Sequence, residues 1–322
     1  MALNNIIDKV YVINLDKDTE RLARFDAQMK EHRIEYTRIS AVVGSTVKET
    51  PALTDWCNKF CTDGMKGCAL SHLQIWNDML KHSYKNVLIF EDDALLEANF
   101  NEVFKEAWDE LPHDFDIFYL GCTLMCDNSY ALSKISTTLT NMSPTHVSEH
   151  IQTVKGSIGT HGYVISNKCA KLFANLAVNF HIDSEITRWI GQYGLSAYSS
   201  HPLIVKIRET QTGSNLSDSY PPLLNTLMHP IKISEGVGLD WSFAEHFLQV
   251  GPYKINGLQK CLMILIILLP YKYVPYFFLW LLLECIASRD FKTTWKFVSL
   301  ICIALIIKYT ILHLYAAATR VS

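Results

Sequence analysis

Short apolar runs alternate with helical patterns along residues 1–256, and this alternation constrains the fold more than any other feature of the chain. Residues 10–15 (VYVINL) are apolar and β-branched, as in a buried strand, and residues 16–33 follow with the charged composition of an exposed helix. Further strands are expected at 86–90, 116–121, 162–166 and 203–207, and further helices at 66–82, 101–111, 167–178 and 183–193. Strands alternating with helices predict an α/β domain with a mainly parallel sheet.

The chain becomes strongly apolar from Leu258 onward, and this shift predicts a domain boundary. We expect a globular domain over residues 1–256 and membrane-associated helices over residues 257–322. A buried helical subdomain of a soluble protein is the less favoured alternative for so much nearly uncharged sequence.

The apolar region contains two segments. Residues 295–318 are long enough to cross a bilayer, although Lys308 near the middle needs a partner, a snorkelling path or a displaced span. Residues 258–287 are broken at Pro270 into halves that are each too short to cross. They predict either one kinked span or a re-entrant hairpin.

Basic residues between the two segments bear on topology: Arg289, Lys292 and Lys296. The positive-inside rule holds such a loop in the cytoplasm. If residues 1–256 lie in the cytoplasm, two full crossings would conflict with that rule, whereas a single crossing or a re-entrant first segment would not. The sequence leaves these two alternatives open.

The charge balance excludes one class of partner. Lys and Arg (29) nearly equal Asp and Glu (32), and the formal net charge is −3. Without a basic field to hold phosphates, the chain is not expected to bind nucleic acid.

The N-terminus and the cysteines both favour a reducing compartment. The first residues lack the basic start and continuous apolar core of a signal peptide. Nine cysteines are odd in number and scattered, and neither close group, at 57, 61 and 68 or at 122 and 126, has the spacing of common zinc knuckles. We expect buried thiols, and a globular domain that faces the cytoplasm from the membrane.

An acidic triplet, Glu91-Asp92-Asp93, follows the apolar strand expected at 86–90. Ligands bind beyond the carboxyl ends of strands in α/β sheets, so the position favours a site. Three adjacent carboxylates repel one another unless a cation compensates them, and a hard divalent ion with oxygen ligands does so. A solvated acidic turn is the alternative for an isolated triplet.

Five motifs that occur in order resemble those of the family-25 glycosyltransferases, which include bacterial lipooligosaccharide and animal procollagen galactosyltransferases. The resemblance covers residues 8–220 and leaves out the apolar C-terminus. The motifs are VYVINLDKDTERL near the start, GCALSHLQIW at 67–76, VLIFEDDALL at 87–96, DIFYLG at 116–121 and GTHGYVIS at 159–166.

The resemblance implies a GT-A-type, Rossmann-like nucleotide-sugar-binding domain, a UDP-hexose donor, and inversion at the anomeric carbon. It also implies a Mn²⁺ or Mg²⁺ ion at the acidic triplet. Asp93 is then the expected direct metal ligand, with Glu91 as a further ligand, and Glu91 or Asp92 reaches the donor ribose or metal-bound water. His201, before Pro202, is a candidate late imidazole ligand.

Two further groups of residues match motifs expected to contact the donor. Asn14, Asp16 and Arg21 belong to the opening motif, where Arg21 can reach a phosphate, and strand-end polarity with helix capping is the alternative. Ser71 and His72 lie near the start of a helix, whose positive end would suit a diphosphate. His72 can equally be a satisfied core histidine.

Inverting transfer needs a base for the acceptor hydroxyl, and the candidates are Asp183 and Glu185 in FHIDSEI. Asp183 is preferred, with helix capping as the alternative. A polar loop at 213–218 is a candidate flap over the donor. The sequence thus predicts hexose transfer, most simply of galactose, to a hydroxyl of a membrane-associated glycan or glycolipid. The alternatives are a protein hydroxyl as acceptor, or an inactive glycan-binding scaffold.

Overall fold

The computed structural model describes residues 3–207, 221–235 and 237–321. The chain divides into two compact units, Met1–Thr212 with Lys232–Val237, and Gly213–Ile231 with Gly238–Ser322. The division therefore falls earlier than residue 256. The reason is that the β13–β14 hairpin (His246–Val250 and Tyr253–Asn256) packs against the apolar helix α10 (Gly257–Leu268) rather than joining the first unit.

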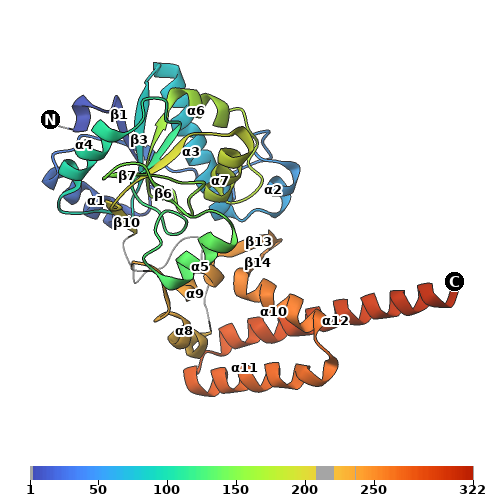
Figure 1. Cartoon of the computed structure of the whole chain (residues 1–322). Coiled ribbons are helices and arrows are strands. Elements are labelled where there is room, and N and C mark those ends of the chain that lie inside the picture. The colour runs from blue at the N-terminus through green and yellow to red at the C-terminus, as the bar shows by residue number, and fades with distance from the viewer. Residues whose placement is uncertain (1–2, 208–220, 236, 322) are drawn as a thin grey trace. The chain divides into compact units, whose positions relative to one another are not determined.

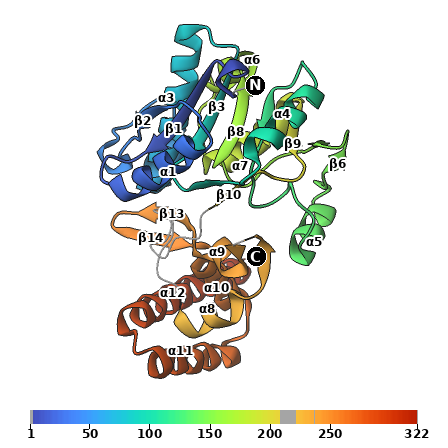
Figure 2. The same cartoon turned by 90° about the vertical axis from the view of Figure 1, so that its left-hand side faces the viewer.

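An eight-stranded sheet forms the centre of the first unit, in the order β2-β1-β3-β8-β5-β9-β7-β6. The prediction of a mainly parallel sheet is wrong, because β8 runs antiparallel to both of its neighbours, β3 and β5. The three parallel pairs are β1 with β2, β1 with β3 and β5 with β9, and Figure 2 shows β1, β3 and β8 side by side. The strands are β1 (Lys9–Asn14), β2 (Thr37–Ser40), β3 (Asn86–Glu91), β5 (Ile117–Tyr119), β6 (Thr145–His146), β7 (Ile151–Thr153), β8 (Gly162–Ser166) and β9 (Ala197–Ser200).

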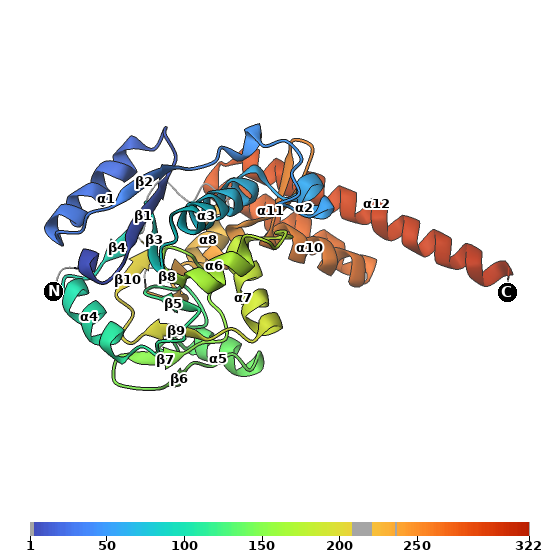
Figure 3. The same cartoon turned by 90° about the horizontal axis from the view of Figure 1, so that it is seen from above.

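Helices cover both faces of this sheet (Figure 3). Helices α1 (Thr19–Glu31) and α4 (Phe100–Glu110) pack on one face, where their apolar side chains share a core with alternate residues of β1, β3 and β8. Helices α3 (Asp63–His82), α6 (Asn167–Phe173) and α7 (Ile182–Tyr193) cover the other. There Phe173 lies between two tryptophans, with ring centroids 5.3 Å from Trp76 and 5.0 Å from Trp189.

The start of α3 explains the glycine of the GCALSH motif. Thr62 caps the helix, its Oγ1 accepting from the Met65 amide. A Cβ added at Gly67 would lie 2.5 Å from the Val42 carbonyl oxygen, so only glycine allows α3 to approach the segment after β2 this closely.

The prediction of thiols is wrong for four cysteines, which form the disulfides Cys57–Cys61 and Cys122–Cys126. The first pair lies at the end of the short helix α2 (Asp55–Phe60), with Cα atoms 4.5 Å apart. The second closes a turn after β5, with Cα atoms 6.1 Å apart. Both separations lie within the range that a disulfide bridges. The cysteine usage therefore no longer argues for a reducing compartment.

The second unit is helical, with the β13–β14 hairpin as its only hairpin among the described residues. Its helices are α8 (Pro222–Met228), α9 (Leu239–Ala244), α10, α11 (Val274–Ser288) and α12 (Phe291–Val321), and α10 and α11 both pack against α12 (Figure 1). One helix in the described part of the chain is long and apolar enough to cross a bilayer, Phe291–Leu314 with a mean hydropathy of 2.2. This test rests on length and composition alone, and α10 and α11, with 12 and 15 residues, are too short to cross.

Two buried charges of this unit bind backbone groups at helix ends. Lys308 donates to the carbonyl oxygens of Ile266 (3.1 Å) and Leu269, where α10 ends. Glu284 accepts from the amides of Leu223 (2.8 Å) and Leu224 (2.9 Å) at the start of α8. Lys308, which the sequence left needing a partner, thus has one inside its own unit.

Candidate active site

The candidate site lies at the carboxyl ends of β1 and β3. These strands are parallel neighbours in which Ile13 pairs with Glu91, so Asn14 and the acidic triplet emerge at the same edge of the sheet. Asn14 is buried, and its Nδ2 donates to Asp92 Oδ2 at 2.6 Å. The acidic triplet thus stands at the carboxyl end of the strand that the sequence predicted at 86–90.

Arg21, in the first turn of α1, joins the group from the helix that follows β1 at the same edge of the sheet. Its Nη2 lies 2.7 Å from Asp92 Oδ1 and 2.5 Å from Asp93 Oδ2. Two carboxylate oxygens thus converge on a single cationic nitrogen. The cation that compensates the triplet in this structure is a guanidinium.

The electrostatics of the pair show that this compensation is incomplete. Burial, together with the negative charge of Glu91, raises the pKa of Asp93 to about 7, despite the opposing effect of Arg21. Burial also raises the pKa of Asp92. A raised pKa means that the ionised form of each carboxyl is disfavoured. A further cation close to Asp92 and Asp93 would therefore stabilise their ionised forms. Their oxygen donors and convergence therefore fit a Mn²⁺ or Mg²⁺ ion.

Glu91 points away from this pair. Its Oε1 accepts from Thr160 Oγ1 at 2.6 Å and lies 3.7 Å from His72 Nε2. Burial raises the pKa of Glu91, but His72 and Thr160 outweigh it and hold that pKa below its usual range. Among the described residues, one group of three has potential ligand atoms within 4.8 Å of one another, namely Cys68, His72 and Glu91. Glu91 thus lies with a thiol and an imidazole rather than with Asp93.

Ser71 and His72, the candidates from α3, are both fully buried. Ser71 Oγ donates to the Gly67 carbonyl (2.7 Å) and accepts from the Val42 amide (2.9 Å). His72 Nδ1 lies 2.9 Å from the Tyr163 hydroxyl. Both side chains thus bind groups that pack against α3, but His72 Nε2 is buried without a hydrogen-bond partner among the described residues, so the histidine is only half satisfied.

Asp16 lies beside Arg38, a residue that the sequence did not single out. Arg38 pairs with Asp16, and its Nε donates to Asn14 Oδ1 at 2.9 Å. Ser40 also donates to Asp16, at 2.9 Å. Arg38 brings a second cation to the end of β1, and it was missed because its strand, β2, is only four residues long and partly exposed.

Asp183 and Glu185 have separate environments on α7. Asp183 Oδ2 accepts from the Gly159 amide at 3.0 Å, in the segment that leads to β8, and α7 begins after His181 rather than Asp183. Glu185 is buried and pairs with Arg188 at 2.5 Å. Asp183 is therefore held against the segment that also carries Thr160, whereas Glu185 is neutralised within its own helix.

Among the described residues, no hydrogen bond or ion pair joins His201 to the acidic triplet. Its ring packs edge-on against His146, with centroids 4.4 Å apart, and burial together with His146 lowers the pKa of His201. The expected polar loop at 213–218 lies outside the described residues.

A family model described as glycosyltransferase family 25 (LPS biosynthesis protein) matches residues 7–186, more than half of the 322 residues. Procollagen galactosyltransferase 1-A of Xenopus laevis is 27% identical over 211 residues, which are 60% of this chain and 33% of that protein. The procollagen lysyl hydroxylase and glycosyltransferase of Acanthamoeba polyphaga mimivirus is 31% identical over 191 residues, 53% of this chain and 20% of that protein.

Similarity extends to proteins named as inactive. The human inactive glycosyltransferase 25 family member 3 is 29% identical over 128 residues, 35% of this chain and 22% of that protein. The chain thus spans a third or less of the length of these curated relatives. Mouse xyloside xylosyltransferase 1 is 12% identical with a TM-score of 0.29, covering 59% of this chain and 64% of that structure, and this score is too low to carry an argument. The match over residues 7–186 contains the acidic triplet, Arg21 and Asp183, and the chain belongs to glycosyltransferase family 25.

Proposed function

We propose that this protein transfers a hexose, most simply galactose, from a UDP-sugar to a hydroxyl of a membrane-associated glycan, with inversion at the anomeric carbon. The observation that carries the proposal is the meeting of Asn14, Arg21, Asp92 and Asp93 at the ends of two parallel strands. Family membership supports a nucleotide-sugar donor.

Each residue of this group suits one task in such a transfer. The buried Asn14 amide orients Asp92. Arg21 and Arg38 supply positive charge at the sheet edge, where a donor diphosphate needs it. A Mn²⁺ or Mg²⁺ ion held by Asp92 and Asp93 would act as a Lewis acid toward the departing diphosphate.

We assign the base to Asp183. Its carboxylate is positioned by the Gly159 amide at 3.0 Å, and no cationic side chain pairs with it in the hydrogen bonds of the described residues. Glu185, by contrast, is paired with Arg188. An inverting transfer needs a carboxylate that takes the acceptor proton while the donor carbon is attacked from the opposite face.

The second candidate acceptor is a protein hydroxyl, which the names of the procollagen galactosyltransferase relatives favour. The third reading, a scaffold without activity, has support from the relatives that are named inactive.

We also propose that the apolar helices attach the protein to a membrane, with the first unit on the cytoplasmic side, where nucleotide sugars are made. The helix Phe291–Leu314 supports the attachment. The two disulfides favour the opposite, oxidising side. Protease protection of intact vesicles decides between the two sides.

The activity is tested with the full chain in detergent and a panel of UDP-sugars, with and without Mn²⁺. We expect one donor to be cleaved only with metal, and Asp92→Asn with Asp93→Asn to abolish cleavage. The matched control is Asp109→Asn, an exposed aspartate whose partner is Lys105. Equal cleavage by the control and the double variant would refute a metal site at Asp92 and Asp93. If no donor is cleaved, the hypothesis of a scaffold without activity is favoured instead.

A further inference from the structure

A thiol, an imidazole and a carboxylate meet where α3 crosses the end of β3. Cys68 and His72 are four positions apart on α3, and residues with this spacing lie on the same face of a helix. Glu91 is the last residue of β3. One potential ligand atom from each of the three side chains lies within 4.8 Å of the other two. None of the tasks assigned above uses this cluster.

The ring nitrogen of His72 that faces Glu91 is buried and unsatisfied. His72 is 0% exposed, and its Nε2 has no hydrogen-bond partner among the described residues. Nε2 lies 3.7 Å from Glu91 Oε1, which is beyond hydrogen-bonding distance, so it is directed into the cluster without a bond there. Because buried polar atoms are nearly always satisfied in folded proteins, this nitrogen points to a ligand.

The other ring nitrogen of His72 is held by Tyr163 of β8. Nδ1 lies 2.9 Å from the Tyr163 hydroxyl, which also accepts from Trp76 Nε1 at 3.2 Å. A hydroxyl oxygen has two lone pairs and can accept from both groups. We therefore assign the proton of His72 to Nδ1, which leaves the lone pair of Nε2 directed at the cluster. Histidines that bind metal ions are held in the same way, by a hydrogen bond from the nitrogen that does not bind the metal.

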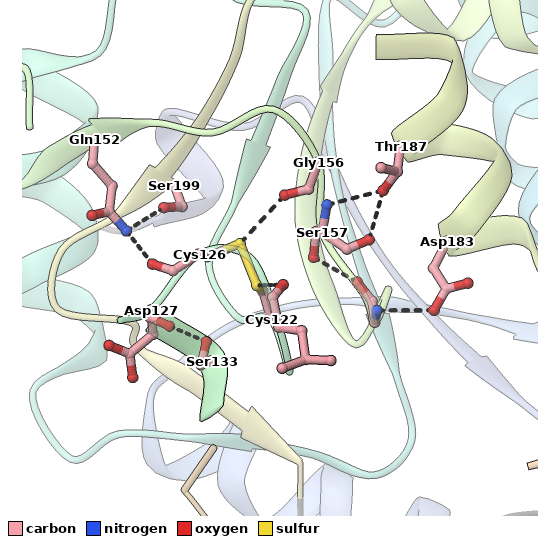
Figure 4. Close-up of a disulfide and its surroundings, with 12 residues drawn as sticks. Cys122, Cys126, Asp127, Ser133, Gln152, Gly156, Ser157, Asp183, Thr187 and Ser199 are labelled. Carbon is pink, nitrogen blue, oxygen red and sulfur yellow. Dashed lines mark hydrogen bonds between the residues drawn. A yellow bond between two sulfur atoms is a disulfide. The ribbon is translucent and has the colours of Figure 1, made fainter. Parts of the chain in front are cut away.

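The two remaining side chains are available to an ion from outside. Glu91 Oε1 accepts from Thr160 Oγ1 at 2.6 Å, which orients the carboxylate. Cys68 belongs to neither disulfide, whereas Cys122 and Cys126 are bonded to each other (Figure 4). Both Cys68 and Glu91 are half-buried, so the cluster reaches the surface on their side although His72 is enclosed.

The ligand types select the ion. Sulfur, nitrogen and oxygen together are the ligands of Zn²⁺, whereas Mn²⁺ and Mg²⁺ prefer oxygen alone. Bond lengths of about 2.0–2.3 Å place the ligand atoms of a tetrahedral zinc site roughly 3.3–3.7 Å apart. His72 Nε2 and Glu91 Oε1 already have this separation, at 3.7 Å. The widest separation in the cluster is within 4.8 Å, so the thiol of Cys68 needs to move by only about 1 Å.

We propose that Cys68, His72 and Glu91 bind a Zn²⁺ ion, with water at the fourth position. Three protein ligands and one open position distinguish this kind of site from a closed structural zinc site. The thiol of Cys68 loses its proton to solvent when the ion binds, so zinc binding releases protons. The inference goes beyond the proposed transfer and does not depend on it. It assigns Glu91 to a different ion from the one proposed for the oxygen donors of Asp92 and Asp93.

The test uses Co²⁺ as a spectroscopic substitute for Zn²⁺. The full chain in detergent is stripped of metal with a chelator, kept free of added thiols and titrated with Co²⁺. Near-ultraviolet absorption then reports charge transfer from a thiolate to cobalt, and competition with Zn²⁺ gives the zinc affinity. The variants are Cys68→Ser, which removes the sulfur ligand, and Tyr163→Phe, which removes only the hydroxyl that holds His72. The controls are Cys261→Ser, at an exposed cysteine of α10, and Asp92→Asn with Asp93→Asn.

We expect one equivalent of Co²⁺ to bind wild type with the thiolate band and to be displaced by Zn²⁺. Cys68→Ser should lose the band. Tyr163→Phe should keep the band and bind Zn²⁺ about 10–100-fold more weakly, because an outer partner of a metal-binding histidine contributes that much to metal affinity. Both controls should keep the band and the zinc affinity of wild type.

The wild-type spectrum decides the inference even if a variant fails to fold. Cobalt binding without a thiolate band, or no binding at all, would leave His72 and Glu91 as a plain ion pair and overturn the zinc site. A band that persists in Cys68→Ser, or that is lost in Cys261→Ser, would overturn it as well. A zinc site in a protein that cleaves no donor would instead refute the proposed function and leave this inference standing.

Discussion

Asp93→Asn is the substitution that most directly tests the electrostatics of the acidic triplet. Asn resembles the protonated aspartate in shape and charge, so the variant reports the free energy of keeping Asp93 ionised in the folded protein. The pKa of Asp93 is about 7, against an ordinary value of 3.8. Arg21 keeps its contact with Asp92 at 2.7 Å in the variant.

The magnitude follows from linkage. The pKa of Asp93 in the folded protein lies about three above its ordinary value. Since a difference of one in pKa is equivalent to about 1.36 kcal/mol, ionised Asp93 lowers the free energy of unfolding by at most roughly 4 kcal/mol. Because the side chain of Asp93 is 23% exposed and charge is shared with Glu91 and Asp92, we expect a gain of about 1–3 kcal/mol.

The sign and the pH window also follow. A raised carboxyl pKa means that the unfolded chain releases its proton first, so wild-type stability falls as the pH rises from about 4 to about 7. Asp93→Asn should therefore match wild type at pH 4 and exceed it at pH 8.

The assay is thermal unfolding of the full chain, followed by tryptophan fluorescence with EDTA at pH 4.5, 6 and 8. Asp109→Asn, at an exposed site on α4, is the control and should not change with pH in this way. Adding Mn²⁺ should raise the melting temperature of wild type but not of Asp93→Asn. A variant that is less stable than wild type at pH 8, or equally stabilised at every pH, would refute the reasoning.

Three further results are expected. Asp183→Ala should lower kcat on the order of 10²–10⁴-fold with little change in donor KM, and stopped-flow binding would contradict the assignment if donor affinity collapses instead. Lys308→Met should lower the melting temperature of the helical unit, because the carbonyls of Ile266 and Leu269 lose their donor. Hydrogen exchange would show this as faster exchange in α10, and unchanged protection there would count against the contact. Protease added outside intact vesicles should digest residues 1–256 if they face the cytoplasm, and full protection would place them in a lumen.

Local patterns in the sequence predicted most of the elements. The apolar runs at 10–15, 86–90 and 162–166 became β1, β3 and β8, because a buried strand needs continuous apolar side chains wherever it lies in the sheet. The short strands β2 and β9 escaped prediction, since four residues with mixed burial carry too little periodicity. The direction of β8 was also beyond reach, because an apolar run has the same pattern whether it pairs parallel or antiparallel.

The sequence by itself determined that an acidic triplet follows a buried strand, that five motifs occur in the order of family 25, and that residues 257–322 are apolar. Only the tertiary structure decided which of these carboxylates act together. Arg21 and Asp93 are 72 positions apart and meet because β1 and β3 are parallel neighbours, whereas Glu91 turns to His72 and Thr160. The physical reason is that adjacent residues at a strand end point in different directions. Their partners then depend on strand register and helix packing, which no local pattern encodes.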